Sequence, residues 1–346
     1  MDSLVSVILP VYNAIKYLET CLEALVKQNY KYLEIIAIND GSTDGSEVLL
    51  EAYAKKYINL FKIIHTKNNG VWRARNIGIS HAQGKYIAFC DSDDIPLPDI
   101  YSKLVVLANN VSADITICPY YRIDIITKKI LSIEMNQFNN DIYNLKNDPG
   151  ILPIINTALW NKLFRASVLK EVIHLAEPPR VLEDMMFLCS IYPKCSKIAF
   201  IDSPQYKYMT RVGSAMNQVS IDEMDAIVNA MIQTKEHVIK YTEDIRYLEI
   251  CDLIAFIHLG ISFPLRLSRS NERLFKSINK TIRLILEQKF PLYKKNQFCT
   301  IRYNLTHKNK TIKIMFVLFF YKFHLINLFL LCYNFISDVL RIEIKW

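Results

Sequence analysis

Short apolar runs alternate with segments of helical periodicity over residues 5–90, and this alternation restricts the possible folds strongly. The runs have the length and continuous apolar character of strands that are buried on both faces. They lie at residues 5–9, 32–38, 61–65 and 85–90. The segments between them repeat apolar residues at helical spacing, as at 15–25 and 71–80. The pattern predicts βαβ units and an α/β fold with a mostly parallel sheet flanked by helices.

Polar segments follow the predicted strands at the point where each strand ends. They lie at residues 10–13, 39–42, 67–70 and 91–94. The carboxyl ends of parallel strands share one edge of a sheet, and ligands of such sheets gather there. We therefore expect one edge of the sheet to carry the chemistry of this chain.

The acidic segment Asp91-Ser92-Asp93-Asp94 stands directly after the fourth apolar run. If the backbone stays extended there, Asp91 and Asp93 point the same way and converge on one cation. Carboxylates are hard ligands that suit Mg²⁺ or Mn²⁺, ions that commonly also bind phosphates. The first interpretation is a divalent cation that holds a diphosphate. The alternative is a solvated acidic turn that caps a helix beginning near Pro98.

The rest of the chain gives weaker predictions. Asp44 is expected to cap a helix, with Glu47 three residues later as its capping-box partner. The expected later elements are a hairpin near Ile130 within an irregular segment at 122–157, a short helix at 158–169, and a helix at 185–192 opened by Glu183-Asp184. Helical periodicity dominates beyond Gly213. We therefore predict two domains, residues 1–215 and 216–346.

Composition limits the class of protein. The chain has 346 residues, of which 51% are hydrophobic and 22% charged, as in a folded protein with an ample core. The eight cysteines are scattered without a C-x-x-C pair, which indicates free thiols in a reducing compartment. Strand-like sequence begins at Val5, so no signal peptide is expected. These features predict a cytoplasmic protein.

The charge is concentrated in the last quarter of the chain. From residue 261 onward there are 16 Lys/Arg and four acidic residues, and the remaining residues carry 26 − 30 = −4. An apolar run at 314–321 ends at Lys322 and is too short to span a bilayer, which needs about 20 residues. We expect one amphipathic helix at about 312–336 that lies on a membrane surface. The alternatives are a buried helix of a C-terminal bundle and a homodimer interface.

Five ordered motifs carry a family resemblance that covers roughly residues 1–215. They are V-S-V-I-L-P-V-Y-N (5–13), N-D-G-S-T-D (39–44), N-G-V-W-R-A-R-N-I-G (69–78), D-S-D-D (91–94) and L-E-D-M-M-F (182–187). Together they resemble glycosyltransferase family 2, in particular bacterial enzymes that build surface polysaccharides such as capsule and O-antigen. The resemblance implies an inverting enzyme with the GT-A fold.

The resemblance also implies roles in binding a nucleotide sugar. Tyr12 would lie against the base, where an aromatic ring offers stacking area. Asp40 would accept a hydrogen bond from a uracil imide, which favours a UDP donor. Arg75 would touch the base or the phosphates. Asp91, with Ser92 beside it, would contact the ribose.

The reaction needs further groups. The resemblance assigns the Mn²⁺ or Mg²⁺ ion to Asp93, with Asp91 as a second ligand, where a cation stabilises the leaving diphosphate. Asp184 would be the base that takes the proton of the acceptor hydroxyl, with Glu183 as the runner-up and an N-cap role for Asp184 as the alternative. Arg211 would bridge the phosphates or have a structural role.

A W-N-K-L-F segment at 160–164 resembles one near the acceptor side of these enzymes, and Trp160 would be a sugar platform or a core residue. The expected activity is transfer of a hexose-type sugar from a nucleotide donor, UDP above all, to an oligosaccharide or polyprenyl-diphosphate-linked acceptor. The expected location is the cytoplasmic face of the membrane, and no nucleic-acid reader motif is visible. Two alternatives are a sugar nucleotidyltransferase and a catalytically silent sugar- or membrane-binding scaffold.

Overall fold

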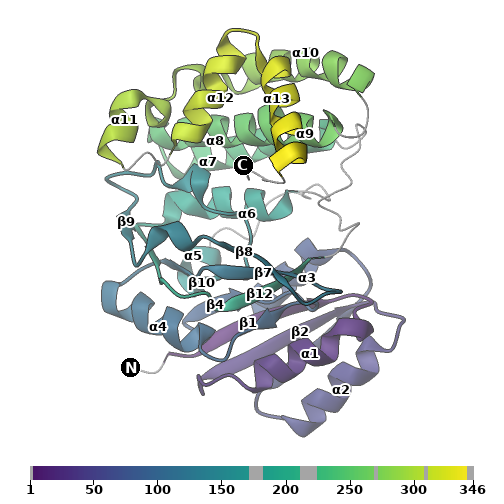
Figure 1. The fold of residues 1–346 in the computed structure, drawn as a ribbon. Helices are drawn as coiled ribbons and strands as arrows, with labels where there is room; N and C mark the ends of the chain where they lie inside the picture. The colour runs from purple at the N-terminus through teal and green to yellow at the C-terminus, as the bar shows by residue number, and fades with distance from the viewer. Residues whose placement is uncertain (1–2, 171–181, 211–223, 269–271, 308–310, 341–346) are drawn as a thin grey trace. The chain divides into compact units, whose positions relative to one another are not determined.

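The computed structural model describes residues 3–170, 182–210, 224–268, 272–307 and 311–340 (Figure 1). The chain divides into two compact units. The first comprises Met1–Asn147, Asn156–Pro178 and Glu183–Val212, and the second comprises Asp148–Ile155, Pro179–Leu182 and Gly213–Trp346. The boundary predicted at residue 215 falls outside the described residues.

The first unit is built on a sheet of eight strands over its described residues. From one edge to the other they are β3 (Phe61–Thr66), β2 (Leu33–Asp40), β1 (Val5–Val11), β4 (Tyr86–Phe89), β10 (Lys162–Arg165), β6 (Ile115–Ile117), β11 (Lys197–Phe200) and β9 (Ile142–Asn144). β10 and β9 run antiparallel to their neighbours, and the other six share one direction. The predicted α/β fold with a mostly parallel sheet is confirmed.

Helices cover both faces of this sheet (Figure 1). One face carries α1 (Ile15–Val26), α2 (Ser46–Lys56) and α4 (Ile100–Val111), and the other carries α3 (Val71–His81), α5 (Ala166–Lys170) and α6 (Glu183–Ile191). Because strand side chains alternate, Val7 and Leu9 of β1 belong to the core under α1, whereas Ile8 packs against α3. The apolar runs are therefore buried on both sides, as their composition predicts.

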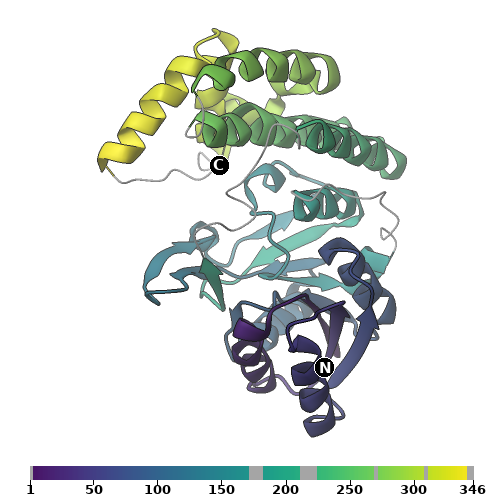
Figure 2. The ribbon, with the colours of Figure 1, turned by 90° about the vertical axis from the view of Figure 1, so that its right-hand side faces the viewer.

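The first unit also contains a second, smaller sheet, which includes the strand directly after the acidic segment. Its strands are β5 (Ile95–Pro96), β12 (Tyr206–Thr210), β7 (Tyr120–Asp124) and β8 (Ile130–Glu134), in that spatial order. β7 and β8 form the hairpin predicted near Ile130, which projects from the first unit (Figure 2). β5 continues directly from the acidic segment, so this sheet anchors that segment from one side.

The short helix predicted for residues 158–169 is wrong. Leu163 and Phe164 lie in β10, between β4 and β6, and only the following residues turn into α5. A strand inside the sheet is buried on both faces, so the consecutive residues Leu163 and Phe164 are both apolar. Consecutive apolar residues also occur in a buried helix, so this pattern does not distinguish the two.

The second unit is helical over its described residues (Figure 1). Its helices are α7 (Met224–Tyr241), α8 (Ile245–Ala255), α9 (Phe263–Ser268), α10 (Glu272–Lys289), α11 (Ile301–Thr306), α12 (Ile312–Lys322) and α13 (Ile326–Leu340), with a π-helical stretch, Phe256–Ser262, joining α8 to α9. The predicted helical C-terminal region is confirmed. Among the described residues, one helical stretch, Ile245–Leu265, is long and apolar enough to cross a membrane, and 78% of its 18-residue window is buried within the structure, as in a core helix.

The single helix predicted for residues 312–336 is wrong in its continuity. α12 ends at Lys322, and His324 adopts a left-handed backbone with φ of 60° before α13 begins. The ring of Phe329 on α13 packs against Phe316 and Phe320 on α12, so the chain turns back on itself. One amphipathic helix that continues through residues 312–336 therefore has no counterpart in the structure.

Candidate active site

Tyr12 and Asp40 lie at the carboxyl ends of two paired parallel strands: Tyr12 directly follows β1, and Asp40 is the last residue of β2. Val11 at the end of β1 pairs in register with Asn39 of β2, so the residues that follow share one sheet edge. The Tyr12 side chain is 52% exposed, which leaves its ring free to cover a planar ligand. Its predicted role at the base remains a prediction, and its exposed ring is compatible with that role.

Asp40 is buried and fastens β2 to the loop that begins α3. Its Oδ1 accepts hydrogen bonds from Thr66 Oγ1 and the Asn69 amide, both at 3.0 Å, and its Oδ2 accepts one from the Gly70 amide at 2.9 Å. Gly41 follows with φ of +74°, and a Cβ there would lie 2.9 Å from the Asn68 nitrogen. Asp40 therefore has a structural function in addition to the predicted contact with uracil, which stays a prediction.

The predicted capping box between Asp44 and Glu47 does not form. Gly45 is the N-cap of α2 and Asp44 precedes it, because the backbone turns through Gly45 at φ of 96°. Asp44 Oδ1 accepts from the Ser46 amide at 3.0 Å and Oδ2 accepts from the Ile15 amide at 2.9 Å, so one carboxylate serves the first turns of α2 and α1. These backbone hydrogen bonds hold the pKa of Asp44 below its usual value, although desolvation acts in the opposite direction.

The segment Asp91–Asp94 is a turn, not the extended backbone expected for it. The Asp94 amide donates to the Asp91 carbonyl at 3.1 Å and closes the turn around Ser92 and Asp93. The alternation argument for Asp91 and Asp93 therefore does not apply. The turn still leaves Asp91, Ser92 and Asp93 partly exposed, whereas Asp94 is buried.

Asp94 and Tyr206 anchor this turn, and their function is not visible in the sequence pattern. Asp94 Oδ1 accepts from the Met209 amide at 2.8 Å, and the Tyr206 hydroxyl accepts from the Asp91 amide at 3.2 Å. Both partners come from β12, more than 100 residues away, so no local spacing signals them. Burial, reinforced by the charges of Asp91 and Asp93, raises the pKa of Asp94 well above its usual value.

Arg75 joins the acidic turn to the first turn of α6. Its buried guanidinium lies 2.5 Å from Asp184 Oδ1 through Nη1 and 3.3 Å from Asp91 Oδ1 through Nη2, with Glu183 Oε1 3.8 Å from Nη1. The structure thus brings together Asp91 and Asp184, which are 93 positions apart in the sequence. It places Arg75 between them; the predicted contact of Arg75 with the nucleotide stays a prediction.

Burial shapes the protonation of the two carboxylates on α6. It raises the pKa of Glu183 to about 7, helped by the neighbouring Asp184 and opposed by Arg75. Burial also raises the pKa of Asp184, with Arg75 as the strongest opposing influence. Asp184 is the second residue of α6 rather than its N-cap, so the capping alternative does not hold. Both carboxylates lie where the helix dipole favours negative charge.

Lys162 is a further polar residue of this region that sequence reasoning missed. Its ammonium is buried and donates to Asn156 O and Oδ1 at 2.8 Å, Ala158 O at 2.5 Å and Asn161 Oδ1 at 3.0 Å. Burial lowers its pKa to about 7, opposed by the charge of Asp184. A lysine inside an apolar strand sequence is the signal that would have identified it.

Trp160 belongs to the core and not to an open sugar platform. It is 6% exposed and stacks on Tyr206 and Tyr208 at centroid distances of 4.5 and 5.2 Å, with Tyr120 against its edge at 4.6 Å. The last predicted site residue, Arg211, lies outside the described residues.

The described residues contain no group of three or more His, Cys, Asp or Glu side chains arranged to hold a metal ion. The partly exposed carboxylates of Asp91 and Asp93 are hard donors on one short turn. Two carboxylates fit a cation such as Mg²⁺, which takes its remaining ligands from phosphates and water.

Comparisons with known proteins agree with the class of enzyme that this fold and cluster indicate. Residues 6–173 match the model of glycosyl transferase family 2. Glycosyltransferase GlyG of Streptococcus pneumoniae is 33% identical over 232 residues, which cover 62% of this chain and 74% of GlyG. The chain belongs to glycosyltransferase family 2 and is a glycosyltransferase.

Solved structures give the same fold. TarS of Staphylococcus aureus (residues 1–349, in complex with UDP-GlcNAc) superimposes with a TM-score of 0.67 at 20% identity, over 91% of this chain and 90% of that one. A mannosyltransferase of Pyrobaculum calidifontis in complex with GDP-Man and Mn²⁺ gives 0.53 at 14% identity, over 92% and 86%. At these identities the likeness concerns the fold, and it confirms the predicted GT-A architecture.

Proposed function

We propose that the chain is an inverting, metal-dependent glycosyltransferase that moves a hexose-type sugar from a UDP donor to a glycan in surface polysaccharide synthesis. The acceptor would be an oligosaccharide or a polyprenyl-diphosphate-linked glycan. The observation that carries the proposal is the Arg75 bridge, which holds the partly exposed turn at Asp91 next to the carboxylate of Asp184. The proposed donor-binding residue Asp91 and the proposed proton acceptor Asp184 therefore belong to one cluster.

Support for a UDP donor comes from the sheet edge. Tyr12 offers an exposed ring directly after β1, and Asp40 ends the neighbouring strand β2. The Asp40 carboxylate has room to accept a hydrogen bond from the imide N–H in addition to those from its three internal donors. TarS, which shares the fold, was solved in complex with UDP-GlcNAc. We infer that the uracil lies between Tyr12 and the loop that Asp40 holds.

A divalent cation is the proposed cofactor. Asp93, with Asp91 beside it, would hold Mn²⁺ or Mg²⁺, and the bound ion would neutralise charge on the departing diphosphate. The mannosyltransferase with the same fold was solved with Mn²⁺. Ser92, in the same turn, would orient the ribose or the diphosphate.

Asp184 is the proposed base. Burial raises the pKa of Asp184, and the neighbouring Arg75 opposes that rise and so favours the ionised carboxylate, the form that would take the proton of an attacking acceptor hydroxyl. The hydroxyl would attack the anomeric carbon as the diphosphate leaves from the opposite face, and one such displacement inverts the configuration. Asp184 is preferred to Glu183 on geometry, because Asp184 Oδ1 lies 2.5 Å from Arg75 Nη1, the group that links it to Asp91, whereas Glu183 Oε1 lies 3.8 Å away.

The proposal is tested by comparing Asp184→Asn with Glu183→Gln in assays with a panel of nucleotide sugars, with and without Mn²⁺. We expect wild-type turnover with a UDP-sugar only when the metal is present. Asp184→Asn should lower kcat by about 10²–10⁴-fold, and Glu183→Gln should lower it much less. Asp202→Asn is a matched control, since the Asp202 carboxylate accepts a hydrogen bond from Asn140 at the surface of the same unit.

Three outcomes would contradict the proposal. Full activity of Asp184→Asn would exclude this residue as the base. A product with retained anomeric configuration would exclude the single displacement. Release of pyrophosphate from a nucleoside triphosphate and a sugar phosphate would identify a nucleotidyltransferase instead.

A further inference from the structure

The second unit exposes a continuous aromatic surface on the α12–α13 hairpin. Phe316, Phe319 and Phe323 are each 55% exposed, and Leu328 and Leu331 of α13 are exposed as well. We call these five residues the aromatic face. Monomeric soluble proteins seldom expose contiguous apolar patches of this kind unless the patch binds something.

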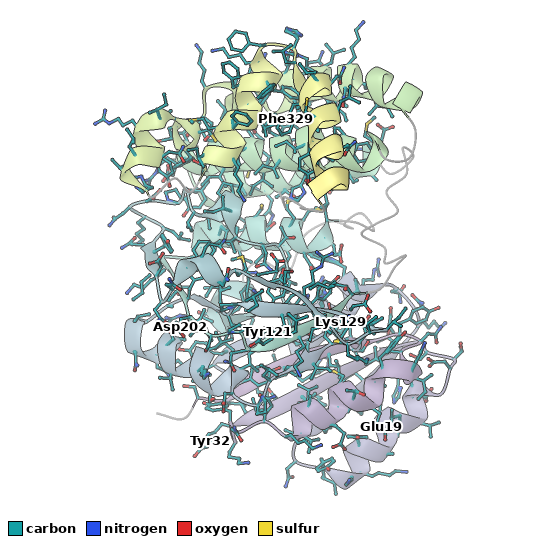
Figure 3. The ribbon with its side chains drawn as sticks, viewed as in Figure 1. Glu19, Tyr32, Tyr121, Lys129, Asp202 and Phe329 are labelled. Carbon is teal, nitrogen blue, oxygen red and sulfur yellow. The ribbon has the colours of Figure 1, made fainter. Side chains whose placement is uncertain are left out.

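Ring contacts show that the phenylalanine side chains of the face belong to one cluster. Phe319 lies 4.7 Å from Phe323 and 5.8 Å from Phe320, and Phe320 lies 5.0 Å from Phe316. Phe329 of α13, labelled in Figure 3, contacts Phe316 and Phe320 of α12 and so joins the two helices. The opposite side of α12 packs inward through Ile314, Val317 and Tyr321, so the aromatic face is not needed for the core of the unit.

Basic residues flank the aromatic face. At about 100° per residue, Phe316, Phe319 and Phe323 fall within a sector of about 60°, and Lys313 and Lys322 lie about 90° to either side of its centre. Both lysines are exposed, as is His324 in the turn. Residues 288–337 contain eight Lys/Arg and no Asp or Glu. The segment of the chain that contains the face is therefore basic.

We propose that the aromatic face docks on an anionic phospholipid bilayer. The rings would enter the boundary between headgroups and acyl chains, and the flanking lysines would snorkel to lipid phosphates. α12 and α13 have 11 and 15 residues, fewer than the roughly 20 that span a bilayer, so the hairpin lies on the membrane.

The same charge pattern argues against a second copy of the chain as the occupant. A twofold interface brings identical patches together, so the two cationic borders would face each other and repel. An anionic lipid surface instead complements the cations and accepts the rings without requiring hydrogen-bonding partners for them. This inference does not depend on which donor or acceptor the enzyme uses.

The test is co-sedimentation of the full chain with phosphatidylcholine vesicles, with and without phosphatidylglycerol, at low and high salt. Wild type should bind the anionic vesicles, and salt should weaken the binding. The triple variant Phe316→Ser/Phe319→Ser/Phe323→Ser should lose at least about tenfold in partitioning. Lys313→Gln/Lys322→Gln should lose about fivefold per charge on anionic vesicles alone.

A matched control replaces two exposed apolar residues of the first unit, Val48 and Ile58, which are 74% and 77% exposed. Val48→Ser/Ile58→Ser should bind vesicles like wild type. Circular dichroism and thermal unfolding establish that each variant is folded. The proposal is overturned if the triple variant still binds vesicles. It is also overturned if wild type ignores vesicles and elutes as a dimer that the triple variant does not form.

Discussion

The Arg75 guanidinium lies against three carboxylates in a largely enclosed site, and the charge balance there affects the protonation of Asp184, the proposed base. Burial favours the protonated form of Asp184, and Arg75 favours the ionised form. The geometry supports this effect, because the Nη1–Oδ1 distance is 2.5 Å and the side chain of Arg75 is only 5% exposed. A residue predicted to bind the nucleotide thus has a second function in the structure, as a positioning residue for Asp184.

This function predicts a shift in the pH dependence of turnover. Replacing Arg75 by Gln removes the charge that lowers the pKa of Asp184, so that pKa rises and less base is ionised at a given pH. The acid limb of the kcat profile should move to higher pH, and the activity lost at about pH 6.5 should exceed that lost at about pH 8.5. The measurement is kcat against pH at saturating donor.

Arg75→Lys serves as the control, because it keeps the charge while losing the planar fork. Its acid limb should stay near that of wild type even if KM rises. If Arg75→Gln raised only KM for the donor and left the acid limb unmoved, Arg75 would be a nucleotide ligand and not a positioning residue for Asp184.

At the scale of elements, the close packing of α3 on the sheet sets the position of Arg75. A Cβ at Gly78 would lie 2.5 Å from Ile8 Cγ2 and 3.0 Å from Ile38 Cδ1, both in the sheet. Gly78 is three residues after Arg75, about one helical turn, so a displacement of α3 at this point also moves the guanidinium.

Gly78→Ala should therefore destabilise the protein by about 1–3 kcal/mol through overpacking, and it should lower kcat. Urea unfolding and steady-state kinetics measure the two effects. Ser80→Ala, on the exposed side of the same helix, should change stability by no more than about 0.5 kcal/mol. Gly78→Ala with wild-type stability would show that β1 and β2 yield at this contact, and that α3 does not depend on it for its position.

The sequence predicted those elements whose evidence is local. β1, β2, β3 and α3 follow from continuous apolar runs and helical spacing, and the motifs at their ends lie along one sheet edge as expected. The sequence predicts a helix where the structure has β10, because a strand buried on both faces lacks the alternation of apolar and polar residues that identifies a half-buried strand.

Parts of the site could not be predicted in the same way, because they depend on contacts between distant segments. The turn at Asp91–Asp94 is fixed by Met209 and Tyr206 of β12, and Arg75 meets Asp184 only when α6 covers the sheet. The ammonium of Lys162 is bound by carbonyls of an irregular segment that begins at Asn156. Spacing within a motif carries no information about such partners.

At the scale of the whole molecule, the two units carry different functional residues. The predicted donor residues that the structure describes all belong to the first unit, whereas the aromatic face belongs to the second. The charge is divided similarly, with 22 − 21 = +1 over the residues of the first unit and 20 − 13 = +7 over those of the second. Long-range attraction to an anionic surface therefore acts mainly through the second unit, and recognition of the donor acts through the first.

Because the proposed donor residues all lie in the first unit, we can predict which peptides UDP, the product released from the donor, protects from hydrogen exchange. UDP with Mn²⁺ should slow exchange in peptides that contain Tyr12, the loop at 39–46, the loop at 67–70 and the turn at 91–94. Binding stabilises the folded state by about 2.7 kcal/mol at a hundredfold excess of UDP over Kd, so exchange that requires local opening slows by up to about a hundredfold.

Peptides from 224–307 should keep their exchange rates, and chelating the metal should remove most of the protection at 91–94. Asp93→Ala should remove the metal dependence while sparing the protection at 39–46 and 67–70, because Asp40 binds the Asn69 and Gly70 amides independently of the cation. Protection that is equal with and without metal would exclude the turn as the cation site, and protection confined to the second unit would place the nucleotide elsewhere.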